Sequence, residues 1–201
     1  MQYEPGERLV IDQIAREMGV SPTPVRDALT RLSGEGFIDF TPFRGFTVFP
    51  DPSLYEIAQS FEARAAIEAA AIRLGCERAT ADQIAELRAI KGRIASTSYG
   101  GRSGSFSRFV KLNQQFHELL VMTGRNTYLV DALKSLYHDA LVARTMHGRG
   151  VPDLAHINEE HDAIIDALER RDPDAAEAAV TRHIVDGAAR VLAARQRAGA
   201  Q

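Results

Sequence analysis

The sequence predicts a mainly α-helical protein, with an N-terminal winged helix-turn-helix followed by an all-α antiparallel helical bundle. Three observations predict this fold class. A glycine turn separates two short helical patterns near the start of the chain. Strand-like runs occur only within residues 1–50, and from residue 51 onward apolar residues recur at three- and four-residue spacing. We therefore expect two domains, residues 1–50 and residues 51–201.

The composition is that of an ordinary globular protein, with 45% apolar and 25% charged residues among 201. No apolar run approaches the ~18 residues that a membrane span needs, and the N-terminus has no signal-peptide pattern. The single cysteine, Cys76, excludes an internal disulfide and is typical of a reducing cytoplasm. We therefore expect a cytoplasmic protein that does not enter a membrane.

Residues 14–29 have the pattern of a helix-turn-helix. Ala15 is small enough for two helices to cross closely, and Gly19 tolerates the positive φ that the turn needs. Ser21 is a good N-cap for the second helix, whose first turn accepts the prolines that follow. Four apolar residues lie at the offsets that lock the helices together: Ile14, Val20, Val25 and Leu29.

Two aromatic and β-branched runs follow, residues 37–40 and 46–49, and they predict a hairpin with Arg44 and Gly45 at its tip. By itself, the helix-turn-helix pattern also fits two amphipathic core helices. A hairpin directly after it favours a DNA-binding domain, in which the second helix presents Thr23 and Arg26 to the DNA. Arg16 adds a basic group to the same segment.

Charge argues against DNA binding. The net charge of the chain is −3, and residues 1–50 carry five arginines against seven acidic residues. Within residues 16–33 the balance reverses to three arginines against two acids. Any DNA-contacting surface must therefore concentrate its basic groups locally.

Helix signals continue through the second half. Asp51-Pro52 predicts the start of a helix, and Thr80 with Gln83 forms a capping-box pattern that opens a helix reaching Ile94. The glycine- and serine-rich residues 96–105 predict a loop. Further helices are expected at 106–122, ending before Gly124, and at 127–146, 153–170 and 173–195. The first helix should bury one stripe: Leu54, Ile57, Ala58, Phe61, Ala65, Glu68 and Ile72.

Three of the six histidines lie on apolar helix faces in this second half. His117 follows Asn113 by four residues, so both lie on one helix face. His161 and His183 are flanked by aliphatic residues on two other helices. Three neutral imidazoles from three helices can hold a divalent transition ion and leave positions open. The alternative for each histidine is a hydrogen-bonded core residue.

Residues 5–9 (Pro-Gly-Glu-Arg-Leu), the run from Gly19 to Leu29 and residues 35–38 (Glu-Gly-Phe-Ile) resemble the GntR family of bacterial regulators. The resemblance implies a homodimer that binds a palindromic double-stranded operator, with Thr23, Arg26 and Gly45 nearest the DNA. Members of the family usually have a helix before the position of Pro5. Because this first helix is missing, we expect the hydrophobic core of the N-terminal domain to be less stable. Pro22 replaces an arginine of many members, which removes one DNA contact.

Residues 54–195 are similar to the FadR-type ligand-binding domain of that family, called FCD. The motifs are Phe116-His117, Gly124-Arg125-Asn126, Glu160-His161 and His183. The resemblance implies a metal held by Asn113, His117, His161 and His183. Members usually have Asp at the first position, and a neutral amide should lower the affinity. We expect zinc, with nickel or manganese as alternatives.

The same resemblance places Arg64 in the ligand pocket, where its guanidinium would suit a carboxylate. Arg144 is a second candidate of this kind. Together with a metal, these arginines favour a small organic acid as effector. We therefore expect a metabolite-responsive repressor, not an enzyme, in which effector binding shifts the dimer away from its DNA-binding state.

Two other functions compete with this hypothesis. A metal-dependent hydrolytic enzyme would use the open metal position to activate water, but only Glu160 or Asp186 could serve it as a base. A helical dimer module that does not bind DNA is the second alternative, because the N-terminal half is acidic and lacks the usual first helix.

Overall fold

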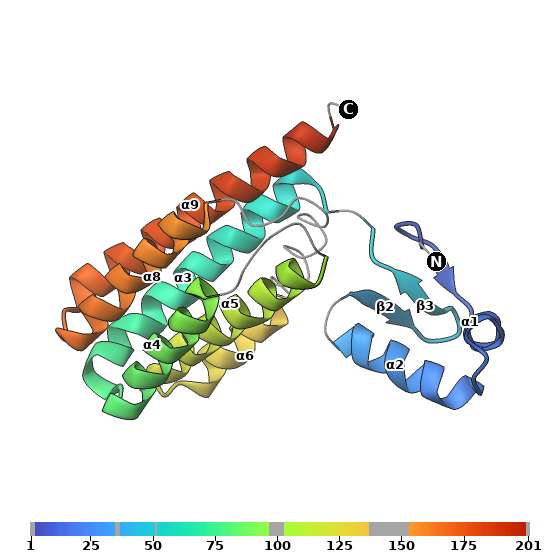
Figure 1. The fold of residues 1–201 in the computed structure, drawn as a ribbon, viewed down its shortest axis with the longest axis horizontal. Helices are drawn as coiled ribbons and strands as arrows, with labels where there is room; N and C mark the ends of the chain where they lie inside the picture. The colour runs from blue at the N-terminus through green and yellow to red at the C-terminus, as the bar shows by residue number, and fades with distance from the viewer. Residues whose placement is uncertain (1–2, 35–36, 51, 97–102, 137–152, 200–201) are drawn as a thin grey trace. The chain divides into compact units, whose positions relative to one another are not determined.

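The computed structural model describes residues 3–34, 37–50, 52–96, 103–136 and 153–199 (Figure 1). The chain divides into two compact units, Met1–Pro52 and Ser53–Gln201. The first combines a small sheet with two helices, and the second is built from helices. The predicted fold class, a winged helix-turn-helix followed by an all-helical domain, is confirmed.

The N-terminal unit holds a three-stranded antiparallel sheet in the order β1-β3-β2. Its strands are β1 (Arg8–Leu9), β2 (Ile38–Thr41) and β3 (Gly45–Val48), and its helices are α1 (Ile11–Met18) and α2 (Pro22–Gly34). The β2–β3 hairpin was predicted. The sequence analysis missed β1, because two residues are too few to show an alternating pattern.

Helices α1 and α2 pack on this sheet through a small core of seven buried residues: Leu9, Ile14, Ala15, Val25, Leu29, Ile38 and Phe46. Gly19 ends α1 with a φ of 67°, and its N–H donates to the last carbonyls of that helix. The prediction that Val20 locks the two helices was wrong. Its backbone N–H closes the turn on Ala15, and its side chain remains 46% exposed.

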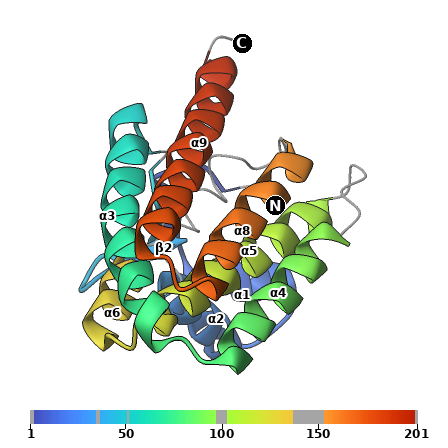
Figure 2. The ribbon, with the colours of Figure 1, turned by 90° about the vertical axis from the view of Figure 1, so that its left-hand side faces the viewer.

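The second unit is a bundle of α3 (Leu54–Arg78), α4 (Ala81–Ala95), α5 (Ser103–Thr123), α6 (Thr127–Ser135), α8 (Leu154–Glu169) and α9 (Pro173–Gly199). The two longest helices, α3 and α9, lie side by side and antiparallel, with α8 beside α9 (Figures 1 and 2). No helix in the described part of the chain is long and apolar enough to cross a membrane.

Local capping sets where these helices begin. Thr80 and Gln83 form the predicted capping box of α4, and the carboxylate of Asp172 accepts from the N–H of Ala175 where α9 begins. The prediction that Asp51-Pro52 starts the first helix of the bundle was wrong. Ser53 is the N-cap of α3, in a reciprocal capping box with Glu56.

Other helix predictions need smaller corrections. Helix α5 begins at Ser103, three residues before the expected start, and α6 ends at Ser135 within the predicted helix 127–146. The rest of that predicted helix, from residue 137, lies outside the described residues. Leu54 and Ala58 of the predicted stripe are exposed. Leu54 lies in the first turn of α3, and Ala58 lies about 100° around the helix from the buried Ile57.

Candidate metal centre

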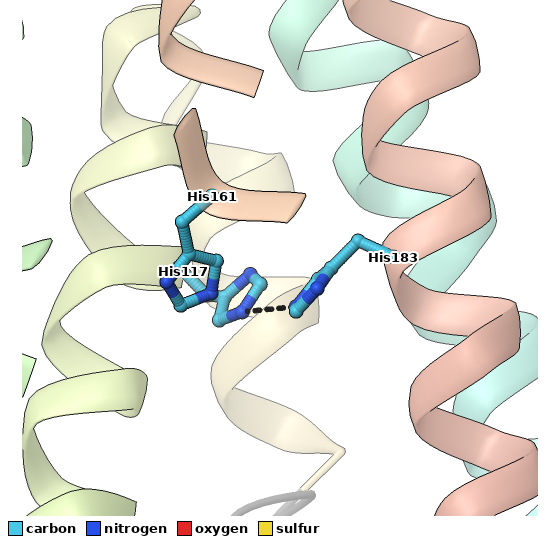
Figure 3. Close-up of side chains that lie close together, drawn as sticks. All are labelled: His117, His161 and His183. Atoms are coloured by element: carbon cyan, nitrogen blue, oxygen red, sulfur yellow. Dashed lines mark hydrogen bonds between the residues drawn. The ribbon is translucent and has the colours of Figure 1, made fainter. Parts of the chain in front are cut away.

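Three histidines meet in the interior of the helical domain (Figure 3). His117 comes from α5, His161 from α8 and His183 from α9, and all three side chains are buried. One ring nitrogen from each lies within 4.8 Å of the others. Residues separated by 44 and 22 positions in the sequence thus form one histidine cluster, the name used below for these three residues.

His183 is held by a buried carboxylate. Its Nδ1 lies 2.7 Å from Glu160 Oε2, and both Nη groups of Arg190 donate to the two oxygens of Glu160 at 2.9 Å. Burial raises the pKa of Glu160, but the hydrogen bonds from His183 and Arg190 outweigh it and lower the pKa to about 2. Because an ionised carboxylate only accepts hydrogen bonds, Nδ1 of His183 donates in this contact and carries a proton.

His117 has a similar arrangement on the opposite side. Its Nδ1 lies 2.7 Å from Oε2 of Glu68, and Arg64 Nε donates to Oε1 of that carboxylate at 2.6 Å. Burial raises the pKa of Glu68, and the charge of Arg64 offsets only part of this effect. Burial also lowers the pKa of His117 well below 6.5, so the ring is neutral at pH 7.

The two remaining nitrogens face each other. His117 Nε2 and His183 Nε2 are 3.1 Å apart. This separation is that of a hydrogen bond, in which one Nε2 donates and the other accepts (Figure 3). When each Nδ1 instead donates to its glutamate, both Nε2 lone pairs are free for an ion, and metal–imidazole bonds of about 2.0–2.1 Å would span the same separation.

His161 and Asn113 complete the fit to a cation. Within the described ranges, neither ring nitrogen of His161 has a hydrogen-bond partner, and nor does the buried Oδ1 of Asn113. Burial lowers the pKa of His161 well below 6.5, and its ring stacks on Phe116 with centroids 4.1 Å apart. Buried polar atoms without partners are costly, and a divalent transition ion bound by the three imidazoles would give His161 a partner. Asn113 precedes His117 by one turn of α5, which makes its amide oxygen a candidate fourth ligand.

One of the two arginines predicted to bind the effector lies in the described part of the chain. Arg64 is buried, and its guanidinium contacts Glu68, which in turn contacts His117 of the histidine cluster. Arg144 lies outside the described residues. The sequence analysis gave no role to Arg190 and placed Glu68 only in an apolar stripe. A glutamate within such a stripe was nevertheless a signal, because a buried carboxylate needs a cationic or hydrogen-bonding partner.

The predicted DNA-contacting residues lie on the surface of the N-terminal unit. Thr23 and Arg26 are exposed on α2, and Arg16 is exposed on α1, where its Nε donates to the carbonyl of Asp12. Arg44 is exposed in the turn between β2 and β3, and Gly45 begins β3 with a φ of 86°. Thr23, Arg26, Arg16 and Arg44 are therefore accessible, and their contacts with DNA stay a prediction.

A winged helix-turn-helix followed by an all-helical domain is the architecture of a class of DNA-binding transcriptional regulators. The chain belongs to one family of this class. The sequence model of the bacterial regulatory proteins, gntR family, matches residues 1–48, and that of the FCD domain matches residues 59–186.

Individual relatives agree with this assignment. The Nta operon transcriptional regulator of Aminobacter aminovorans is 34% identical over 184 residues, covering 90% of this chain and 83% of that protein. The probable D-xylose utilization operon transcriptional repressor of Paenarthrobacter nicotinovorans is 27% identical, covering 86% and 74%. The structure of E. coli McbR/YncC matches with a TM-score of 0.74 at 20% identity, covering 94% and 88%. These relatives are regulators of transcription, which confirms the prediction that the protein is not an enzyme.

Proposed function

We propose that the protein is a cytoplasmic, metabolite-responsive repressor that binds double-stranded operator DNA as a homodimer. Residues 1–50 would contact DNA, and residues 51–201 would bind the effector and form the dimer. Membership of the GntR family supports the DNA-binding role, and one relative that covers 86% of this chain is named a repressor.

The histidine cluster is the observation that carries the sensing role. His117, His161, His183 and Oδ1 of Asn113 would hold a divalent transition ion, with zinc preferred and nickel or manganese as alternatives. The ion would supply positive charge and an open coordination position. Both are suited to the carboxylate of a small organic acid, and the burial of the three histidines would limit competition from water.

Arg64 and Arg144 are the proposed arginine contacts of the effector. The buried position of Arg64 supports a role inside the helical domain. Because its Nε is engaged by Glu68, an effector carboxylate would meet its Nη groups. Effector binding would then shift the dimer toward arrangements with weaker operator binding.

In the DNA-binding unit, the N-terminal half of α2 would enter the major groove. Thr23 and Arg26 would contact bases or phosphates there, and Arg16 would contact the backbone. Arg44 and Gly45 would approach the DNA from the hairpin. Their exposure supports these roles, since none is needed for the seven-residue core of this unit.

Metal content tests the sensing site. Wild-type protein purified without chelators should contain about one transition ion per chain, measured by mass spectrometry of the dissolved metal. The variant His117→Ala should lose it, whereas Lys134→Ala, at an exposed residue of α6 away from the histidine cluster, should keep it. Metal-free wild-type protein that takes up none of the three ions in a titration would contradict the proposed site.

Operator binding tests the regulatory role separately. A duplex selected from random sequences by the wild-type protein should be bound tenfold or more weakly by Arg26→Ala, because such a contact contributes about 1–3 kcal/mol. The control Lys111→Ala removes an exposed charge from α5 and should bind normally. Failure to select any duplex would favour the DNA-free dimer module.

A further inference from the structure

We infer that Arg64 and Arg190 are positioning residues of the metal centre, each acting through a buried glutamate that fixes the orientation of one histidine. The inference rests on the proposed metal site. It concerns two sets of three residues that converge on one point: Arg64, Glu68 and His117 on one side, and Arg190, Glu160 and His183 on the other.

The geometry of the second set shows how such positioning works. The fork of Arg190 donates to both oxygens of Glu160, which fixes the plane of that carboxylate. Oε2 then lies 2.7 Å from Nδ1 of His183. A ring that donates from Nδ1 keeps the lone pair of Nε2 for a metal, and this nitrogen is the one that faces His117.

The arginines are needed because the glutamates are buried. A buried carboxyl group is costly unless its oxygens have hydrogen-bond partners. Glu68 is fully buried, and Arg64 donates to its Oε1 while its Oε2 lies 2.7 Å from Nδ1 of His117. Each arginine thus holds its glutamate in the position from which it orients a histidine.

His161 provides an internal contrast. It is held by stacking on Phe116, and no described residue forms a hydrogen bond with either of its ring nitrogens. Its tautomer is therefore not fixed before a metal binds. The cluster thus combines two oriented ligands with one that can adapt to the ion.

The charge of the proposed ligands also bears on the effector. These ligands are three imidazoles and an amide oxygen, none of which is an anion. A divalent ion at this site would therefore keep most of its positive charge. Such a centre favours an anion in the open position, which strengthens the assignment of the effector to the carboxylic acids.

Nitrogen-15 NMR of the imidazole rings in metal-free protein tests this positioning directly. In the wild type, His117 and His183 should be fixed with the proton on Nδ1, and His161 should show no such preference. In Glu160→Gln and Arg190→Gln, the His183 ring should lose its fixed tautomer. Glu159→Gln changes an exposed neighbour on the same helix and should leave the His183 signals unchanged.

Metal affinity, measured by competition with a chromophoric chelator, provides the second readout. Glu160→Gln and Arg190→Gln should bind zinc about 10–100-fold more weakly than the wild type. Arg190→Lys should recover part of the loss, because it restores the charge without the fork. Unchanged tautomers and affinity in a folded Arg190→Gln protein would overturn the inference. A wild type that binds no metal would overturn the proposed site instead, while the NMR result would still decide the positioning.

A separate observation concerns Phe43 in the N-terminal unit. Its side chain is completely exposed, and its φ of 66° lies in the left-handed region that favours glycine. The N–H of Arg44 donates to the carbonyl of Thr41 at 3.1 Å, so Phe43 is the third residue of a tight turn between β2 and β3. A large aromatic residue at this position is strained and contributes no burial to the fold.

We propose that Phe43 inserts into the minor groove of operator DNA. Strain kept at an exposed position indicates a role outside the fold. The charge of Arg44 next to it is complementary to phosphate, and proteins that bind the minor groove often insert apolar side chains between base steps. The inference rests on the proposed operator binding.

Phe43→Gly distinguishes a role in DNA binding from a role in folding, because it should weaken DNA binding without lowering the stability of the N-terminal unit. Glycine relieves the strain, so the melting temperature of the N-terminal unit should stay the same or rise. Affinity for the selected duplex, measured by fluorescence anisotropy, should fall about tenfold, as expected for the loss of one specific contact. The exposed Tyr128→Ala in α6 should bind as the wild type does. Wild-type affinity of Phe43→Gly would overturn the inference, whereas loss of binding only in Arg26→Ala would still support operator recognition.

Discussion

Substitution of Gly75 by alanine should destabilise the helical domain, because α3 approaches α5 closely at this residue. A Cβ at Gly75 would lie 2.2 Å from Oγ1 and 3.2 Å from Cβ of Thr123, and 3.4 Å from Leu168. The hydroxyl of Thr123 donates to the carbonyl of Leu120 at 2.6 Å, so rotating it away breaks a buried hydrogen bond.

The size of the effect follows from two opposing terms. Overpacking of a core costs about 1–3 kcal/mol, and replacing a helical glycine by alanine returns about 0.5–1 kcal/mol. The net loss should be about 1–2 kcal/mol. For a domain of this size, that corresponds to a fall in melting temperature of about 2–8 °C, which circular dichroism at 222 nm measures.

Gly92→Ala is the matched control. A Cβ at Gly92 in α4 would meet nothing within 4 Å, so this variant should be more stable by about 0.5–1 kcal/mol. When Thr123 is already alanine, Gly75→Ala should lower the melting temperature less than it does in the wild type, because the nearest clashing atom is absent. If Gly75→Ala and Gly92→Ala changed the melting temperature in the same direction, the packing argument would be wrong.

Three further predictions concern pH, capping and metal. Burial lowers the pKa of His117 and His161 well below 6.5 in the folded protein, so the unfolded state binds more protons below that pH. The free energy of unfolding of metal-free protein should therefore fall as pH drops through 6.5, and urea titrations should show a smaller fall in His161→Phe. Ser53→Ala removes the N-cap of α3 and should cost about 1 kcal/mol, whereas Ser53→Thr should melt like the wild type. Zinc at about 100 times its dissociation constant should add about 2.7 kcal/mol to the unfolding free energy, and a chelator should reverse this gain; equal melting curves with and without zinc would contradict the site.

Much of the fold was predictable because its signals are local. Gly19, Thr80 and Asp172 mark helix ends through backbone requirements that involve only nearby residues. Strand β1 could not be predicted in this way, since its two residues form a strand only by pairing with β3. The start of α3 was misplaced because the Asp-Pro pattern of residues 51–52 was preferred to the capping box of Ser53 and Glu56, a local signal that the sequence also carries.

The candidate site also combines features with local sequence signals and features that depend on long-range contacts. The three histidines were identifiable from their residue type and apolar surroundings. Their carboxylate partners were not, because Glu68 lies 49 residues from His117, and Glu160 lies 23 residues from His183. Arg190 gave no signal, since an arginine near the end of a long helix usually faces solvent. Only the packing of α3, α8 and α9 brings these charges together.

The position of Arg64 leads to a last prediction, on how metal and effector influence each other. If the effector displaced Glu68 from Arg64, His117 would lose its orienting carboxylate, and effector and metal would weaken each other's binding. If the effector instead bound the open metal position while Arg64 kept Glu68, each would strengthen the other, and by linkage the two factors would be equal. The short Arg64–Glu68 contact and the complete burial of Glu68 favour the second case. We therefore expect small carboxylic acids found by thermal-shift screening to bind more tightly to zinc-loaded than to metal-free protein in calorimetry. Tighter binding to the metal-free protein would instead show that the effector competes with Glu68 for Arg64.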